Sequence, residues 1–77
     1  MVSRPEKHSL TLRGHRTSVT LEPEFWRAFR EIARRRDTPL NSLAAEIDES
    51  RDPGTGLATA IRLFVLKDLQ GAGRPSD

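Results

Sequence analysis

The segment from Ser9 to Leu21 constrains the fold most, because polar and apolar residues alternate along it with a period of two. Such alternation predicts a half-buried strand, in which successive side chains point to opposite faces. The apolar positions are even at Leu10 and Leu12. They are odd from Val19 onward. One straight strand would therefore place the two apolar groups on opposite faces, so the chain must change phase within this segment.

The change of phase falls at Arg13-Gly14-His15-Arg16, where glycine can adopt the positive φ that a turn or bulge requires. Two arrangements follow from this. In the first, residues 9–13 pair with residues 17–21 as a hairpin. In the second, an arm leads into a single strand near residues 16–21.

Three helices are predicted after the strand segment. Glu22-Pro23-Glu24 opens the first, since proline suits the first helical turn and acids complement the helix dipole. Asp37-Thr38-Pro39 ends it and begins the second, with Thr38 as the expected N-cap. Arg51-Asp52-Pro53-Gly54 is a turn signal before the third. We expect one domain over residues 9–70 between a flexible basic arm (1–8) and a frayed tail (71–77), with strand or strands at 9–21 and helices at 22–36, 39–50 and 56–69.

The third predicted helix argues for a homodimer. Its apolar residues cover most of its circumference, so it must be buried on several sides. A chain of 77 residues without cysteine has a small core and no disulfide to support it. A second copy of the chain is the simplest remaining cover. We expect the dimer core to include Val19, Leu21, Phe25, Phe29, Ile32, Leu43, Ile47, Ile61 and Phe64.

Several classes of function are disfavoured. The longest uncharged apolar run is Leu63–Leu66, too short to span a membrane, and no secretory signal is visible, which predicts a cytoplasmic protein. No nucleophile motif or glycine-rich phosphate loop is present, so we expect neither an enzyme nor a cofactor. His8 and His15 do not define a ligand set in a chain without cysteine, so no metal is expected.

The charge is divided unevenly along the chain. Residues 1–36 carry a net charge of +5, and residues 37–77 carry −3. A basic half-chain favours a polyanionic partner, such as nucleic acid. The alternative is that the two halves neutralise each other within the fold.

The predicted strand itself has a polar face. With Val19 and Leu21 directed to the core, the side chains of Arg16, Ser18 and Thr20 project together from the other face. A two-stranded antiparallel ribbon fits the major groove of B-DNA, which is roughly 12 Å wide. Arginine can pair there with guanine, and serine or threonine can contact several base edges. An ordinary solvent-facing strand would show the same pattern.

The stretch from Arg16 to about Ile47 resembles the Arc- and MetJ-like ribbon-helix-helix family. Arg16-x-Ser18-x-Thr20-x-Glu22 resembles the family's strand, and the stripe Phe25…Phe29…Ile32-Ala33 resembles its first helix. Asp37-Thr38-Pro39-Leu40-Asn41-Ser42 resembles its inter-helix turn, although Asp37 stands where glycine is usual. The stretches Arg13-Gly14-His15-Arg16-Thr17-Ser18 and Glu22-Pro23-Glu24-Phe25-Trp26 are most similar to a subgroup of uncharacterised small bacterial members.

The resemblance implies a mainly helical homodimer with a short β-ribbon, one strand from each chain, plus an additional C-terminal helix and a possible extra N-terminal strand. It implies that Arg16, Ser18 and Thr20 contact bases. The expected phosphate contacts are Lys7, Arg13, His15, Leu40 and Asn41. A hairpin would give the dimer a four-stranded sheet, roughly 14 Å wide at the strand spacing of about 4.8 Å, which exceeds the groove.

The leading hypothesis is therefore a sequence-specific DNA-binding homodimer, a transcriptional repressor that reads double-stranded DNA and is nucleoid-associated in the cytoplasm. The alternative is a dimeric protein-interaction module, antitoxin- or adaptor-like, which keeps the fold without entering the groove. Its partner would bind Trp26 and the acidic cluster of Glu46, Asp48 and Glu49.

Overall fold

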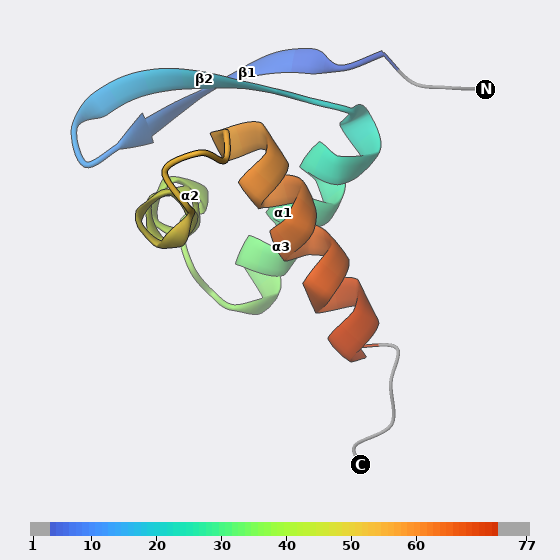
Figure 1. Ribbon diagram of the computed structural model, residues 1–77. Helices are drawn as coiled ribbons and strands as arrows, with labels where there is room; N and C mark the ends of the chain where they lie inside the picture. Colours follow the sequence, from blue (N-terminus) through green and yellow to red (C-terminus); the bar gives the residue numbers. More distant parts are fainter. Residues whose placement is uncertain (1–3, 73–77) are drawn as a thin grey trace.

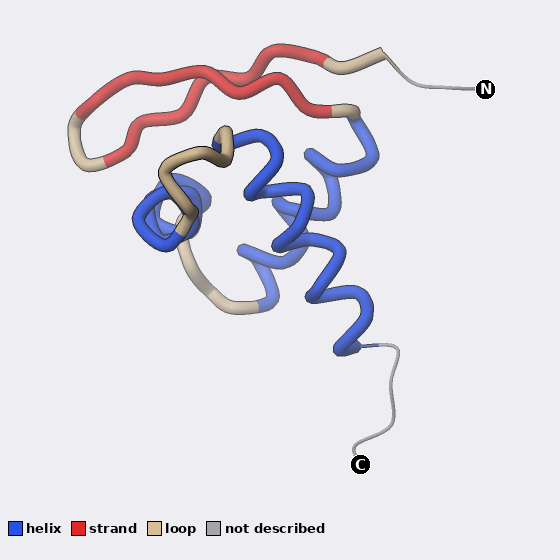
Figure 2. Tube along the Cα trace, viewed as in Figure 1, coloured by secondary structure: helices blue, strands red, loops and turns tan. Residues whose placement is uncertain are grey.

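The computed structural model describes residues 4–72 of the chain. A two-stranded hairpin lies across one side of the three helices, so the molecule has a sheet layer and a helix layer (Figures 1 and 2). The elements in chain order are β1 (Glu6–Leu12), β2 (His15–Leu21), α1 (Pro23–Arg35), α2 (Leu40–Ser50) and α3 (Leu57–Ala72). The predicted ribbon-helix-helix fold with a C-terminal helix and an extra N-terminal strand is confirmed.

The hairpin is the first of the two arrangements that the sequence left open. β1 and β2 pair antiparallel, with His8 opposite Val19 and Leu12 opposite His15. The two-residue turn has positive φ angles of 54° at Arg13 and 82° at Gly14. Positive φ at both central residues is typical of a type I′ turn, and the twist of this turn matches the twist of the flanking strands. Both strands of the ribbon thus come from one chain, whereas the resemblance implied one strand from each of two chains.

The element boundaries differ slightly from the prediction. β1 begins at Glu6, so residues 6–8 of the expected arm belong to the strand. α3 continues to Ala72, into the expected tail. Residues 1–3 of the expected arm and residues 73–77 of the expected tail lie outside the described residues.

A short turn joins α1 to α2. Asp37 has a φ of 53°, the left-handed conformation that glycine adopts most readily. Its N–H donates to the carbonyl of Arg34, and the N–H of Thr38 donates to that of Ala33, both at 3.0 Å. This pair of bonds is a Schellman motif. The prediction of Thr38 as N-cap was wrong, because Pro39 occupies that position and the Thr38 hydroxyl donates to the Arg36 carbonyl at 3.1 Å.

The core lies between the inner face of the hairpin and the helices. Leu10, Val19 and Leu21 of the hairpin are almost fully buried against apolar side chains of all three helices. The residues expected in a dimer core are buried within this single chain, except Phe25 and Phe64, which are half-buried at its edge. The sequence argument underestimated the available cover, because it did not count β1 as a second strand.

Candidate nucleic-acid interface

The outer face of the hairpin carries an uninterrupted polar surface without acidic residues. Opposed residues on this face are paired across the strands, and all six side chains are exposed. We call this set the outer ribbon face: Lys7 with Thr20, Ser9 with Ser18, and Thr11 with Arg16. The helices lie on the other side of the hairpin (Figure 2), so the described residues leave the outer ribbon face open. The three predicted base-contacting residues therefore share one accessible surface.

The start of α2 lies beside the outer edge of β1. The N–H of Thr11, which points away from β2, donates to Oδ1 of Asn41 at 3.1 Å. A shallow groove at this point is lined by Thr11, Arg13, Asn41 and Ser42, together with Ala45 and Glu46. The structure thus brings Asn41 next to the ribbon, through a side-chain contact that sequence reasoning missed.

The first backbone N–H groups of α2 are not capped by a side chain. The N-cap residue is Pro39. The first N–H groups of a helix have no partner within the helix, and they attract anions together with the helix dipole. Leu40 and Asn41, the predicted backbone phosphate contacts, occupy these first positions. The helix end and the outer ribbon face lie side by side, linked by the Thr11–Asn41 bond.

The three other predicted phosphate contacts, Lys7, Arg13 and His15, do not lie on one surface. Lys7 lies on the outer ribbon face. Arg13 lies in the turn and forms an ion pair with Glu49 of α2. His15 is opposite Leu12, so it belongs to the inner side of the ribbon. There it lines a groove that Leu57 also lines, facing away from Lys7. The structure places Lys7 on the outer ribbon face, whereas Arg13 and His15 line the same groove between the turn and the helices.

An ion pair fixes the far end of β2 to α3. Nε of Arg62 donates to Oε1 of Glu22 at 2.9 Å, and Nη2 donates to Oε2 at 3.1 Å. The same Nη2 donates to the carbonyl of Thr20 at 3.4 Å, at the free edge of β2. These hydrogen bonds from Arg62 hold the pKa of the Glu22 carboxyl below its usual value. No local sequence signal links residues 40 positions apart.

The residues of the expected protein-binding surface form contacts within the chain. The ring of Trp26 stacks on His8, with centroids 3.8 Å apart and an interplanar angle of 5°. Asp48 accepts a hydrogen bond from Arg51 at 2.8 Å, and Glu49 pairs with Arg13. His8 and Arg13 lie near opposite ends of β1, five residues apart or roughly 17 Å of strand. Trp26 and the acidic cluster therefore do not make one surface.

The arginine run at the end of α1 also makes contacts inside the chain. Arg34 pairs with Glu31, which lowers the pKa of that carboxyl. Arg35 donates to Asp68 of α3 at 2.5 Å, and the guanidinium carbon of Arg36 lies 5.0 Å from the centroid of the Phe64 ring. The run thus joins α1 to α3 and is not part of the outer ribbon face.

Within residues 4–72, no group of three or more His, Cys, Asp or Glu side chains is placed to hold a metal ion. No helix in the same range is both long enough and apolar enough to cross a membrane.

The two-stranded ribbon, the helical pair behind it and the basic outer surface define a nucleic-acid-binding class of small domain. The family model described as ribbon-helix-helix domain matches residues 5–69, and the chain belongs to that family. Members of the family commonly bind DNA as dimers, and the fold is typically non-enzymatic. No curated protein and no solved structure gives a significant match.

Proposed function

We propose that this protein is a sequence-specific, DNA-binding homodimer that represses transcription in the cytoplasm, on the nucleoid. Each chain inserts its own hairpin into the major groove, with Arg16, Ser18 and Thr20 against base edges. The observation that supports this most strongly is the outer ribbon face, which is exposed, polar and free of acidic side chains over both strands.

The width of the ribbon agrees with groove entry by a single hairpin. Two strands lie about 4.8 Å apart, and the major groove is roughly 12 Å wide, whereas a four-stranded sheet of about 14 Å is too broad. Pairing of two copies along β2 would have to displace Arg62 from the carbonyl of Thr20. We therefore assign reading of the groove to the hairpin of one chain, not to a sheet built from two.

Phosphate contacts flank the hairpin in this proposal. The backbone N–H groups of Leu40 and Asn41 meet one phosphate at the start of α2, where the groove beside Thr11 gives access. Lys7 adds positive charge on the outer ribbon face, and Arg13, in the turn at its end, exchanges its pairing with Glu49 for a phosphate. His15 is left out of this set, because it lies on the inner side of the ribbon.

Titration of the protein against duplexes of random and selected sequence, followed by fluorescence anisotropy at several salt concentrations, tests the proposal. We expect affinity to fall steeply with salt, because bound cations are displaced from the DNA. Arg16→Ala should reduce discrimination between sequences by roughly tenfold, since a bidentate arginine–guanine pair contributes about 1–3 kcal/mol. Arg27→Ala is the matched control, because Arg27 is an exposed arginine on α1 outside the outer ribbon face.

Two outcomes would contradict the proposal. Absence of binding to any duplex at tens of micromolar protein and low salt would exclude nucleic acid as the partner, given that non-specific affinities are about 10⁻⁴–10⁻⁶ M even at physiological salt. An equal loss of affinity for all sequences in Arg16→Ala and Arg27→Ala would exclude base reading by Arg16. The interaction-module alternative has no specific support, since Trp26 stacks on His8 within the chain.

A further inference from the structure

The outer ribbon face has two strands, and the proposed function assigns base contacts to β2 only. Thr11, on the extra N-terminal strand β1, is exposed on this face directly opposite Arg16. The N–H of Thr11 bonds outside the hairpin. The two residues therefore form a non-hydrogen-bonded pair, the kind in which Cα atoms are about 4.5 Å apart and side chains are closest. The side chain of Thr11 thus lies next to the arginine that the proposed function places on guanine.

One hydrogen bond fixes Thr11 relative to α2. Its N–H donates to Oδ1 of Asn41 at 3.1 Å, across 30 residues of sequence. Asn41 is the second residue of α2, and its own backbone N–H is one of the two that the proposed function places on a phosphate. The side chain of Asn41 therefore joins a residue that faces the bases to the helix end that holds the DNA backbone.

This bond is the polar link that persists when DNA binds. In residues 4–72, two hydrogen-bonded or ionic side-chain contacts join the hairpin to α2, namely the Thr11–Asn41 bond and the Arg13–Glu49 ion pair. The proposed function moves Arg13 from Glu49 to a phosphate, so the Thr11–Asn41 bond remains. Phosphate contacts set the register of a protein on DNA, and base contacts read sequence within that register. Asn41 is placed to transmit the register to β1.

The side chain of threonine matches one base in particular. It carries a methyl group beside its hydroxyl, and in the major groove this methyl packs against the C5 methyl of thymine. Base pairs are about 3.4 Å apart, so two side chains about 4.5 Å apart reach neighbouring base pairs. We propose that β1 is a second reading strand, in which Thr11 selects a thymine beside the guanine of Arg16, and Asn41 is its positioning residue. This inference rests on the proposed function and extends base reading to the other half of the hairpin.

Removal of one methyl group from each side of the contact tests the role of Thr11. A duplex is first selected by the wild-type chain from a randomised library, and Arg16→Ala identifies its guanine as the position where the preference relaxes. Replacing the neighbouring thymine by uracil removes only the C5 methyl. In fluorescence anisotropy it should weaken wild-type binding by roughly two- to fourfold, as for one buried methyl group. Thr11→Ser keeps the backbone N–H but lacks the methyl, so it should bind the two duplexes equally.

Thr17→Ser is the matched control for this substitution. Thr17 is also an exposed threonine of the hairpin, but it is opposite Leu10 on the inner side. Thr17→Ser should therefore show the full wild-type loss when thymine is replaced by uracil.

Two substitutions of Asn41 separate positioning from charge. Asn41→Ala removes the acceptor for the Thr11 N–H, and it should lower the preference for thymine more than it lowers the affinity for random duplex. Asn41→Asp keeps an oxygen acceptor but adds negative charge beside the phosphate. It should therefore weaken binding to all duplexes alike and retain the preference for thymine. A residue that only stabilised the fold would not give these opposite results.

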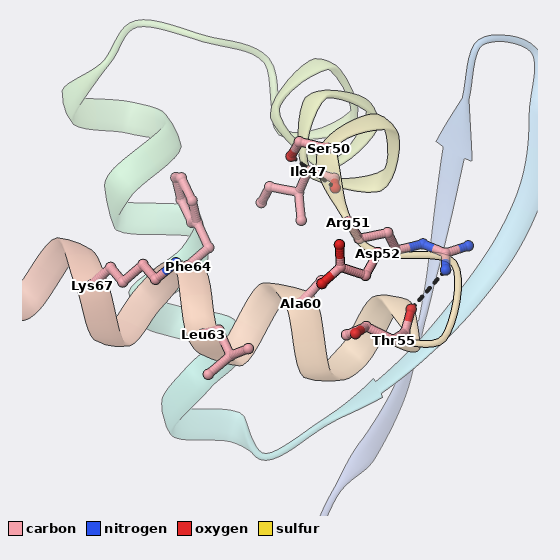
Figure 3. Close-up of a pocket in the computed structure, with 9 residues that line it drawn as sticks. All are labelled: Ile47, Ser50, Arg51, Asp52, Thr55, Ala60, Leu63, Phe64 and Lys67. Carbon is pink, nitrogen blue, oxygen red and sulfur yellow. Dashed lines mark hydrogen bonds between the residues drawn. The ribbon is translucent and has the colours of Figure 1, made fainter.

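Ser50→Ala is the control for a side-chain bond elsewhere on α2. The hydroxyl of Ser50 donates to the carbonyls of Glu46 at 3.1 Å and Ile47 at 3.2 Å, at the far end of the helix. Figure 3 shows it beside Ile47, at the groove between α2 and α3. Ser50→Ala should leave the preference for thymine unchanged.

The outcomes distinguish this inference from the proposed function. A wild-type chain without sequence-selective binding overturns both. Selective binding to a site with no thymine beside the guanine overturns the inference alone, and so does a Thr11→Ser variant with the wild-type loss on uracil. Asn41→Ala that weakens binding to selected and random duplexes in the same proportion overturns the positioning role.

Discussion

The two faces of the hairpin are built from the same strands and have opposite character. On the inner face, Leu10, Val19 and Leu21 are at most 4 % exposed. On the outer face, every side chain is polar and exposed, including Arg16 and Lys7. Because side chains alternate along a strand, one short segment both closes the core and presents a basic surface. We therefore expect substitutions at Val19 and Leu21 of β2 to change mainly stability, and substitutions at the even-numbered positions of β2 to change mainly DNA binding.

Substitution on the inner face should have the largest effect on stability. Leu21 is fully buried, so Leu21→Ala should lower the free energy of unfolding by about 3 kcal/mol through lost burial and an unfilled cavity. Its neighbour Thr20 is exposed, and Thr20→Ala should change stability by less than about 0.5 kcal/mol. Chemical denaturation of both variants measures the difference. Equal losses would show that the two faces do not differ as the structure describes.

The separation of faces also depends on the turn that sets the strand register. Gly14 has a φ of 82°, and an added Cβ would meet nothing within 4 Å. Gly14→Ala should therefore lower the free energy of unfolding by about 1–2 kcal/mol through backbone strain alone. Thermal and chemical unfolding give the magnitude. A neutral result would mean that the turn relaxes to another type without loss, and that the register is not held there.

The second left-handed position lies between the helices and is occupied by a non-glycine residue. Asp37 has a φ of 53°, and it forms no ion pair in the described part of the chain. Asp37→Gly should raise the free energy of unfolding by roughly 0.5–1 kcal/mol, since glycine adopts this conformation without strain. Asp37→Ala is the matched control and should lower it. Destabilisation by glycine would contradict a strained turn.

The smallest expected effect concerns the ion pair at the end of β2. Hydrogen bonds from Arg62 lower the pKa of Glu22 in the folded chain below its ordinary value of 4.5. A carboxyl with a lowered folded pKa stabilises the fold above its unfolded pKa, and this contribution is lost as pH falls through the folded pKa. Glu22→Gln should therefore reduce stability at pH 7 and flatten its decline below pH 4.5. Parallel acid curves would contradict the assignment.

Local patterns predicted much of this fold. The phase change around Gly14 indicated a turn or bulge there and left a hairpin as one of two arrangements, and Pro23 and Pro39 indicated the starts of α1 and α2 to within about one residue. The odd-numbered apolar positions of β2 placed Arg16, Ser18 and Thr20 together on its opposite face. That placement is confirmed, whereas their contact with bases stays a prediction.

Contacts between distant segments were outside the reach of those patterns. The Thr11–Asn41 bond spans 30 residues, and the Arg62–Glu22 bond spans 40. No periodic pattern in the sequence reports either bond, because each depends on how the hairpin packs against the helices. His15 is odd-numbered like Val19 and Leu21 of the same strand, so it lies on their side of the ribbon, and its contact with a phosphate stays a prediction.

The most direct measurement of the central claim is an NMR titration of the isotope-labelled chain with a short duplex at low salt. We expect the backbone amide shifts to change most along the outer ribbon face, at residues 7, 9, 11, 16, 18 and 20, and at Leu40 and Asn41 at the start of α2. The inner-face amides should change less, and those of the exposed side of α1 least. Shifts concentrated on α1, or none at saturating duplex, would contradict groove reading by the hairpin.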